Sequence, residues 1–244
     1  MSFENSNVFN KENLDTYLKA LGKEYSKLGG RKMPAELILI GGAAILENYG
    51  FRDMTTDVDA IIHALSALKG AIRKVSDTYS LPNDWLNAEF VKTASYSDKL
   101  VQYSIHYRTF YGALNVRTIT AEYLIAMKLR SGRKYKNDLS DIIGILAEHE
   151  KRGTVITYDQ IDTAVVNLYG SWDDIPGDSV TFIKDTLAHG RYEEVYQTIR
   201  NSEKLAKESL LKFSEEYPDA LKESNVEDVL KRLKARKKER IENQ

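Results

Sequence analysis

The chain has 244 residues, 42% of them hydrophobic and 29% charged, a composition typical of a globular protein with a sizeable buried core. Its formal net charge of -1 at pH 7 excludes an overall charge bias toward nucleic acid or a membrane surface. The sequence contains no cysteine, which excludes disulfides, thiolate nucleophiles and cysteine-ligated zinc.

The hydrophobic pattern of the first part of the chain predicts alternating helices and strands. Apolar residues first recur every three or four positions, as in an amphipathic helix, until Gly29 and Gly30 end the pattern. The run ELILI that follows is rich in large aliphatic residues and predicts a buried strand. The expected elements are a helix at 11–28, a strand at 36–40, a helix at 43–50 ended by Gly50, a strand at 57–62 and a helix at 65–79 ended before Pro82.

The next segment predicts a hairpin and two helices. Residues 100–119 are dense in β-branched and aromatic side chains, with Gly112 available for a turn, and are expected to form two strands. Thr120 is expected to cap a helix over AEYLIAMKLRSG. Either Asn137 or Asp138 is expected to cap the helix that follows.

The order of these elements predicts an α/β or α+β domain over residues 1–153. From there the pattern is helical, so residues 154–244 are expected to form an all-helical region. TYDQ at 157–160 is a capping box, and Gly170 and Gly190 are suitable helix stops.

The C-terminal segment predicts a long helix at 191–215 and a last helix from about Asn225. The final residues, KRLKARKKERIENQ, carry seven basic residues against two acidic ones. Such a tail is able to contact RNA phosphates, and it is equally compatible with a solvated, partly frayed helix.

The sequence lacks a recognisable targeting or membrane segment. Its first residues, MSFENSNVFNKENL, have neither the basic start nor the apolar stretch of a signal peptide. No apolar run approaches the roughly 20 residues that a membrane helix needs. With the lack of cysteine, this predicts a cytoplasmic protein with no membrane partner.

Asp57 and Asp59 are the clearest candidates for chemistry. Side chains alternate along a strand, so both carboxylates are expected on one face of an otherwise apolar element. Burying two repelling carboxylates is costly unless a cation neutralises them, and oxygen ligands of this kind suit Mg²⁺ or Mn²⁺. The alternative is a surface strand carrying two solvated aspartates.

Gly41 and Gly42 lie between a predicted strand and a predicted helix. Glycines at such a junction let backbone amides approach a phosphate, and the helix N-terminus adds partial positive charge. The simpler interpretation is a tight turn. The glycine pair followed about fifteen residues later by the acidic pair favours a site that binds nucleotide phosphates together with metal.

GGAAILENYGFRDMTTDVDAI resembles the first motif of nucleotidyltransferases of the DNA polymerase β-like superfamily, in which a glycine pair precedes two aspartates. It looks closest to the branch that contains AbiEii and MenT-type toxins of toxin–antitoxin and abortive-infection systems. The matching positions are Gly41, Gly42, Ala43, Ala44, Arg52, Thr55, Thr56, Asp57, Val58 and Asp59. The resemblance implies a mixed sheet flanked by helices, with Arg52 and Thr56 assisting at the nucleotide.

A second block, EYLIAMKLRSGRKYKNDLSDIIGIL, is similar to a later motif of that branch. The corresponding residues are Lys128, Arg130 or Arg133, Asp138 and Asp141, and Asn137 stands where a basic residue is usual. The resemblance implies that Lys128 and Asp141 are needed for activity. Physically, the two aspartates share a helix face and are able to orient the lysine. The alternative is a helix-capping Asp138 with a surface salt bridge.

The resemblance implies a Mg²⁺-dependent transfer of NMP from an NTP to a tRNA 3′ end or a protein hydroxyl, by a toxin with a cognate antitoxin as partner. Polymerase β-like enzymes usually have a third carboxylate on a later strand, and residues 100–119 contain none. Glu89 and Asp98 lie upstream, but no pattern selects either of them. The alternative function is a catalytically degenerate binding module that acts through protein contacts.

Overall fold

A computed structural model of the chain describes residues 8–63, 66–222 and 224–242, with the backbone alone described at 66–67 and 238–242. The first seven residues of the predicted domain and the predicted helix start at residue 65 lie outside the described residues. So do the side chains of Lys238 and Arg240 in the basic tail.

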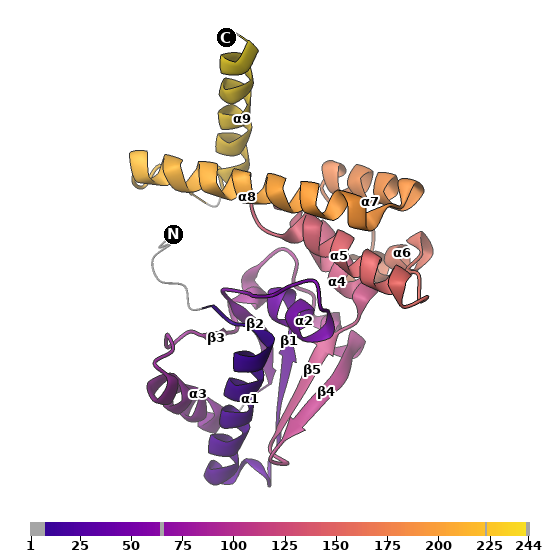
Figure 1. Ribbon diagram of the computed structural model, residues 1–244. Coiled ribbons are helices and arrows are strands. Elements are labelled where there is room, and N and C mark those ends of the chain that lie inside the picture. The colour runs from indigo at the N-terminus through magenta and orange to yellow at the C-terminus, as the bar shows by residue number, and fades with distance from the viewer. Residues whose placement is uncertain (1–7, 64–65, 223, 243–244) are drawn as a thin grey trace.

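A five-stranded mixed sheet forms the N-terminal part of the fold, with strand order β3-β2-β1-β5-β4 (Figure 1). The strands are β1 (Ala35–Leu39), β2 (Val58–His63), β3 (Leu86–Asn87), β4 (Ser104–Phe110) and β5 (Leu114–Ile119). β1 is antiparallel to β2 and parallel to β5. β3 is parallel to β2, and β4 and β5 form the predicted antiparallel hairpin.

Helices flank this sheet and form most of the C-terminal part of the described chain. They are α1 (Lys11–Tyr25, continued by a π-helical turn at Ser26–Gly30), α2 (Gly41–Asn48), α3 (Ser66–Tyr79), α4 (Ala121–Ser131), α5 (Asp138–Lys151), α6 (Tyr158–Tyr169), α7 (Gly177–His189), α8 (Tyr192–Glu216) and α9 (Val226–Glu242). The predicted fold class, a nucleotidyltransferase-like mixed sheet flanked by helices with a helical C-terminal region, is confirmed.

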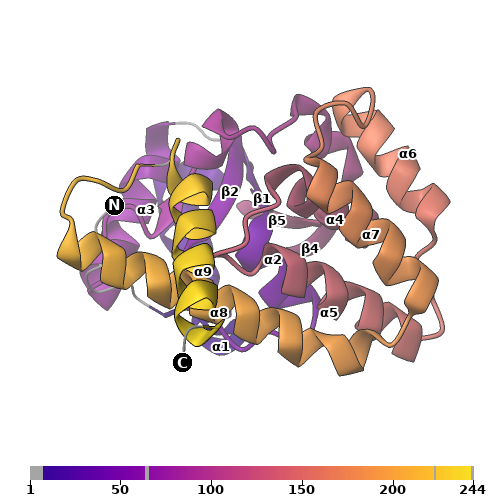
Figure 2. The same ribbon diagram turned by 90° about the horizontal axis from the view of Figure 1, so that it is seen from above.

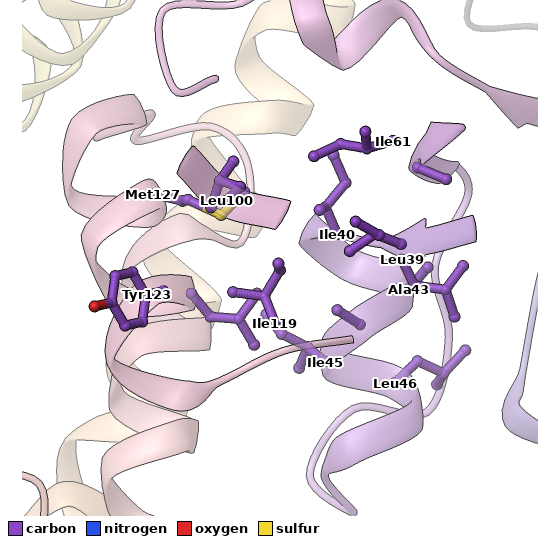
Figure 3. Packing of buried hydrophobic residues seen from close by; sticks show 14 of the residues in the cluster. Leu39, Ile40, Ala43, Ile45, Leu46, Ile61, Leu100, Ile119, Tyr123 and Met127 are labelled. Carbon is purple, nitrogen blue, oxygen red and sulfur yellow. The ribbon is translucent and has the colours of Figure 1, made fainter. Parts of the chain in front are cut away.

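The core lies between β1, α2 and the start of α4. Leu39, Ile40 and Ile45 are fully buried. Figure 3 shows Ile45 beside Ile119 at the end of β5, with Tyr123 from the first turn of α4 on the other side of Ile119. Because β1 is central and covered on both faces, its sequence is a continuous aliphatic run rather than an alternating one.

Several element boundaries differ from the sequence predictions. Gly41 and Gly42 belong to the first turn of α2, and the helix ends with Tyr49 as its C-cap, so Gly50 is not the stop. The hairpin starts only at Ser104, because the residues before it form a 3-10 helix. β3 is absent from the predicted elements, since a strand of two residues shows no periodic pattern.

The capping predictions are confirmed in part. The capping box at Thr157 is present, and Gly170 and Gly190 are the C-caps of α6 and α7. Thr120 and Asn137 stand at the N-cap positions of α4 and α5, but neither side chain makes a capping hydrogen bond.

The C-terminal helices cover one end of the α/β part. α5 packs along α8, and α4 packs against α6. Figure 1 shows α8 crossing above the sheet with α9 projecting away from it, and Figure 2 shows α9 lying across α8. A small separate cluster of Ala206, Leu210, Val226 and Leu230 joins these two helices. None of the described helices has both the length and the apolar character to cross a bilayer.

Glu203 on α8 forms hydrogen bonds with the N-terminus of α5. Its Oε1 accepts the backbone N–H of Leu139 at 2.8 Å, and its Oε2 accepts the hydroxyl of Ser140 at 2.5 Å. Burial raises the pKa of Glu203 to about 7, although these hydrogen bonds favour the charged form and oppose that change. The two orphan amides at the start of α5 explain why a carboxylate is kept at this buried position.

We expect Glu203→Gln to become progressively more stable than the wild type as the pH rises from about 5 to about 8. A carboxyl with a folded pKa above its unfolded value contributes stability below the unfolded pKa and loses it as pH rises through the folded pKa. The difference is at most about 3 kcal/mol, and glutamine keeps the acceptor for the amides. Urea unfolding at several pH values measures it.

The matched control for this pH series is Glu208→Gln, since Glu208 is exposed on the same helix. Its stability difference from the wild type is expected to stay constant over the same range. A Glu203→Gln difference that is equally constant would contradict the prediction.

Candidate active site

The two glycines place the N-terminus of α2 directly after β1. Gly41 has a φ of 55°, in the left-handed region that favours glycine. At Gly42 a Cβ would lie 2.4 Å from the Thr55 hydroxyl and 2.9 Å from the Arg52 guanidinium, so this position has no room for a side chain. The N–H groups of this first turn have no partner within the helix and carry partial positive charge.

Asp59 lies beside this turn, and Asp57 lies just before β2. The Asp59 carbonyl accepts the N–H of Ile40 at 3.1 Å, and its carboxylate oxygen is 3.7 Å from where a Gly41 Cβ would be. Asp59 is partly buried, whereas Asp57 is exposed. The prediction that both charges are buried is therefore wrong for Asp57, because the strand begins one residue later than predicted.

The acidic pair has the electrostatic character of a cation site. Burial raises the pKa of Asp59, and the negative charge of Asp57 raises it further. The positive charges of Lys136 and Arg133 and a hydrogen bond from Asn87 act in the opposite direction. Two oxygen donors that repel each other fit a hard divalent ion, whose charge would remove the repulsion. Thr56 donates its hydroxyl to Asp57 at 3.2 Å, which fixes that carboxylate.

Asn87 is a member of this site that the sequence analysis missed. It lies on β3 opposite Asp59 in the parallel register, so both side chains are on the same face of the sheet. Its Oδ1 accepts the N–H of Glu89 at 2.9 Å, which leaves its amide to face Asp59. No sequence signal marks Asn87, because its position depends on the pairing of β3 with β2.

Lys128, Asp138 and Asp141 form a buried ionic chain. The Lys128 ammonium lies 2.8 Å from one oxygen of each aspartate, and both carboxylates are fully buried. Arg52 bonds both oxygens of Asp141, at 2.9 and 2.6 Å. Arg133 donates its backbone N–H and its guanidinium to Asp138. Positive and negative groups therefore alternate along the chain from Arg133 to Arg52.

This network differs from the simpler sequence interpretation of a capping Asp138 and a surface salt bridge. The Asp138 carboxylate forms ion pairs with Lys128 and Arg133 instead of capping α5. Asp138 and Lys128 are both buried, so their ion pair is not a surface salt bridge. Although burial by itself raises it, the pKa of Asp138 is held well below its usual range by the charges of Lys128 and Arg133. Opposite charges likewise keep the pKa of Lys128 raised despite its burial.

The structure brings the predicted site residues together in two neighbouring groups, here called tiers, and Arg52 contacts both of them. Gly41, Gly42, Thr56, Asp57 and Asp59 form the tier at the end of the sheet. Lys128, Asp138 and Asp141 lie behind it, bonded to one another. Arg52 joins the two, since its guanidinium contacts Asp141 and approaches Thr55 beside the glycine turn.

A third carboxylate does not complete the acidic pair in the described part of the chain. No three histidine or acidic side chains among the described residues lie close enough to hold a metal ion together. Glu89 is exposed and paired with Lys92, and Asp98 is exposed at the start of a 3-10 helix.

The comparison with protein families agrees with this geometry. The family model described as a nucleotidyltransferase of unknown function (DUF6036) matches residues 16–149, more than half of the chain. The match contains the glycine turn, the acidic pair and the whole buried ionic chain. No curated protein and no solved structure is significantly similar to the chain. The chain belongs to the nucleotidyltransferase family of unknown function DUF6036.

Proposed function

We propose that the protein is a Mg²⁺- or Mn²⁺-dependent nucleotidyltransferase that transfers NMP from an NTP to a hydroxyl group. The observation that carries this proposal is the placement of Asp59, whose carboxylate is close to Asp57, beside the glycine-formed N-terminus of α2. Membership of a nucleotidyltransferase family supports the same reaction class.

In the proposed reaction an acceptor hydroxyl oxygen forms a bond to the α-phosphorus, and the bond from that phosphorus to the β-phosphate oxygen breaks. Pyrophosphate leaves and the hydroxyl proton passes to water. Asp57 and Asp59 would hold the divalent ion, which supplies charge neutralisation for the phosphate oxygens. The amides of Gly41 and Gly42 would donate to those oxygens. Gly41 has the left-handed backbone and Gly42 the close approach to Thr55 and Arg52 that favour glycine at this turn.

The buried ionic chain gives this site its rigidity. Arg52 holds the loop that carries Asp57 against α5, because its guanidinium spans Asp141 and the carbonyl of Met54. Lys128 and Asp141 act in the proposal by holding this arrangement, since each is fully engaged by buried partners. Preorganised charges of this kind favour a transition state without reorganisation cost.

The acceptor in the proposal is a tRNA 3′ end or a protein hydroxyl, and the biological role is that of a toxin with a cognate antitoxin. Both rest on the resemblance of the two motifs to the AbiEii and MenT-type branch. The exposed basic residues of α9, among them Lys231, Arg232 and Lys234, are compatible with an RNA acceptor.

Nucleotide transfer is tested by incubating the purified protein with each α-phosphate-labelled NTP, Mg²⁺ and total tRNA, with a parallel arm of cellular protein. We expect label on one acceptor class, and none when the label is on the γ-phosphate, because pyrophosphate leaves. Periodate-blocked tRNA separates 3′-end transfer from other sites. Folded protein that transfers no label from any NTP would favour the binding module, which the missing third carboxylate among the described residues supports.

A further inference from the structure

Tyr196 on α8 contacts the loop that carries Arg52. Its hydroxyl donates to the backbone carbonyl of Phe51 at 3.2 Å, and its ring meets the Phe51 ring edge-on, with 5.8 Å between the centroids. The Phe51 ring also lies against α5, where a Cβ at Gly144 would be only 2.4 Å from it. The residue before Arg52 is therefore enclosed between α8 and α5, two helices that pack along each other (Figure 2).

Glu203 makes the second contact from the same face of α8, because it lies seven residues after Tyr196. Its buried carboxylate accepts the hydroxyl of Ser140 at 2.5 Å as well as an amide of the first turn of α5. Ser140 directly precedes Asp141, the buried partner of Arg52. One face of α8 thus contacts the residue before each member of the Arg52–Asp141 ion pair.

Arg200 lies on the same face of α8, between these two contacts. Its guanidinium donates to the Tyr196 oxygen at 3.3 Å and lies 5.9 Å from the centroid of the tyrosine ring. Because the oxygen accepts this hydrogen bond, the hydroxyl hydrogen remains for the Phe51 carbonyl. Tyr196 is therefore oriented from its own helix toward the loop.

The contact from α8 matters because the loop between α2 and β2 lies outside the regular helices and strands. An isolated bridge pairs its backbone with the N-terminal segment at Thr55, and the Tyr196 hydroxyl bonds it four residues earlier. Arg52 lies between these two points, and Asp57 follows shortly after them. Loss of one point would let both side chains move, and a displacement of about 1 Å is enough to lower a rate by about a hundredfold.

We propose that α8 positions the candidate active site, with Tyr196 and Glu203 as positioning residues that hold the two segments joined by the Arg52–Asp141 ion pair. This inference rests on the proposed nucleotidyltransferase function and adds that the helical C-terminal region controls the rate of transfer. The nucleotide phosphates would contact the first turn of α2 and the bound ion, so the expected effect is on the rate and not on nucleotide binding.

Tyr196→Phe tests the proposal, because it removes the hydroxyl and keeps the ring. We expect kcat for nucleotide transfer to fall about tenfold, with KM for the NTP within about twofold of the wild type. Hydrogen exchange of the backbone at 50–57 is expected to become faster. Tyr192→Phe is the matched control, expected to change none of these. Tyr192 is buried one turn earlier on α8, and its hydroxyl has no hydrogen-bond partner in the part of the chain that the structure describes.

Two substitutions of Glu203 test the contact with α5. Glu203→Gln keeps an oxygen that accepts the α5 amide and is expected to keep at least about a third of the wild-type kcat. Glu203→Ala removes the acceptor and is expected to lower kcat about tenfold or more, again with little change in KM. Circular dichroism verifies that each variant is folded. Should Glu203→Ala not fold, the comparison of Tyr196→Phe with its control decides.

The outcomes separate the two proposals. Transfer by Tyr196→Phe at the wild-type kcat overturns the inference and leaves the proposed function standing. A rise in KM with unchanged kcat also overturns it, because the hydroxyl would then act on nucleotide binding. Equal losses of kcat in Tyr196→Phe and Tyr192→Phe overturn it as well, since they would reflect the packing of α8 in general. A wild type that transfers no label removes the proposed function together with the control of its rate. Hydrogen exchange then decides the positioning by itself, and exchange at 50–57 that is unchanged in Tyr196→Phe overturns it.

Discussion

Asp59→Asn is expected to lower nucleotide transfer by about a thousandfold or more without unfolding the protein. The divalent ion bound by the acidic pair contributes several kcal/mol of transition-state stabilisation, and each 1.4 kcal/mol is about a factor of ten in rate. Asparagine keeps the shape of the side chain but removes the charge. The rate of label transfer at saturating Mg²⁺ and NTP measures the effect.

The same substitution separates a catalytic loss from a folding defect. Burial and the charge of Asp57 both disfavour ionised Asp59, so its neutral replacement is expected to keep or raise the melting temperature. Mg²⁺ or Mn²⁺ is expected to raise the melting temperature of the wild type and not that of Asp59→Asn. Asp53→Asn, in the exposed loop upstream, is the control with unchanged transfer. Transfer by Asp59→Asn at the wild-type rate would contradict metal-dependent chemistry at this site.

Asp141→Ala is expected to destabilise the fold by about 3–5 kcal/mol. The change leaves the guanidinium of Arg52 and the ammonium of Lys128 without their shared carboxylate, in a region from which water is excluded. Removing one partner of a buried ion pair lowers the free energy of unfolding by more than the intact pair contributes to it, because the remaining charges are left buried without a partner or water. Urea unfolding followed by circular dichroism gives the difference in unfolding free energy.

Asp15→Ala is the matched control for this stability measurement. Asp15 pairs with Arg108 at 2.7 Å, a distance similar to that in the buried chain, but both side chains are substantially exposed. Its removal is expected to cost less than about 1 kcal/mol. A loss of similar size in the two variants would show that burial of the ionic chain does not determine the stability of the fold.

The local hydrophobic pattern and the capping residues were sufficient to predict most of the secondary structure. The aliphatic run of β1, the amphipathic period of α1 and the capping box at Thr157 each depend on residues that are close in sequence. The first and last residues of helices and strands were less predictable from the sequence where the backbone conformation of single residues decides them. Gly41 begins α2 with a left-handed φ, which the helical pattern does not show. Asp57 lies one residue before β2, so Asp57 is exposed and only Asp59 is partly buried.

The candidate site was predictable as residue types and not as an arrangement. Gly41, Gly42, Asp57 and Asp59 are close in sequence, and their spacing across a strand and a helix already indicates a phosphate and metal site. Their link to Asp141 through Arg52 spans many residues of sequence and depends on how α5 packs beside the loop after α2. The hydrophobic periodicity of the sequence does not predict a contact between two side chains that are this far apart along the chain.

The amino-acid sequence alone determined the α/β character, the glycine turn and the candidate cation ligands, because these depend on local propensity and on side-chain chemistry. Tertiary structure decided which charges pair with which. It places Lys128 among buried carboxylates and Asn87 opposite Asp59. These outcomes depend on strand register and helix packing between distant segments, where burial and not spacing sets the energy of each charge.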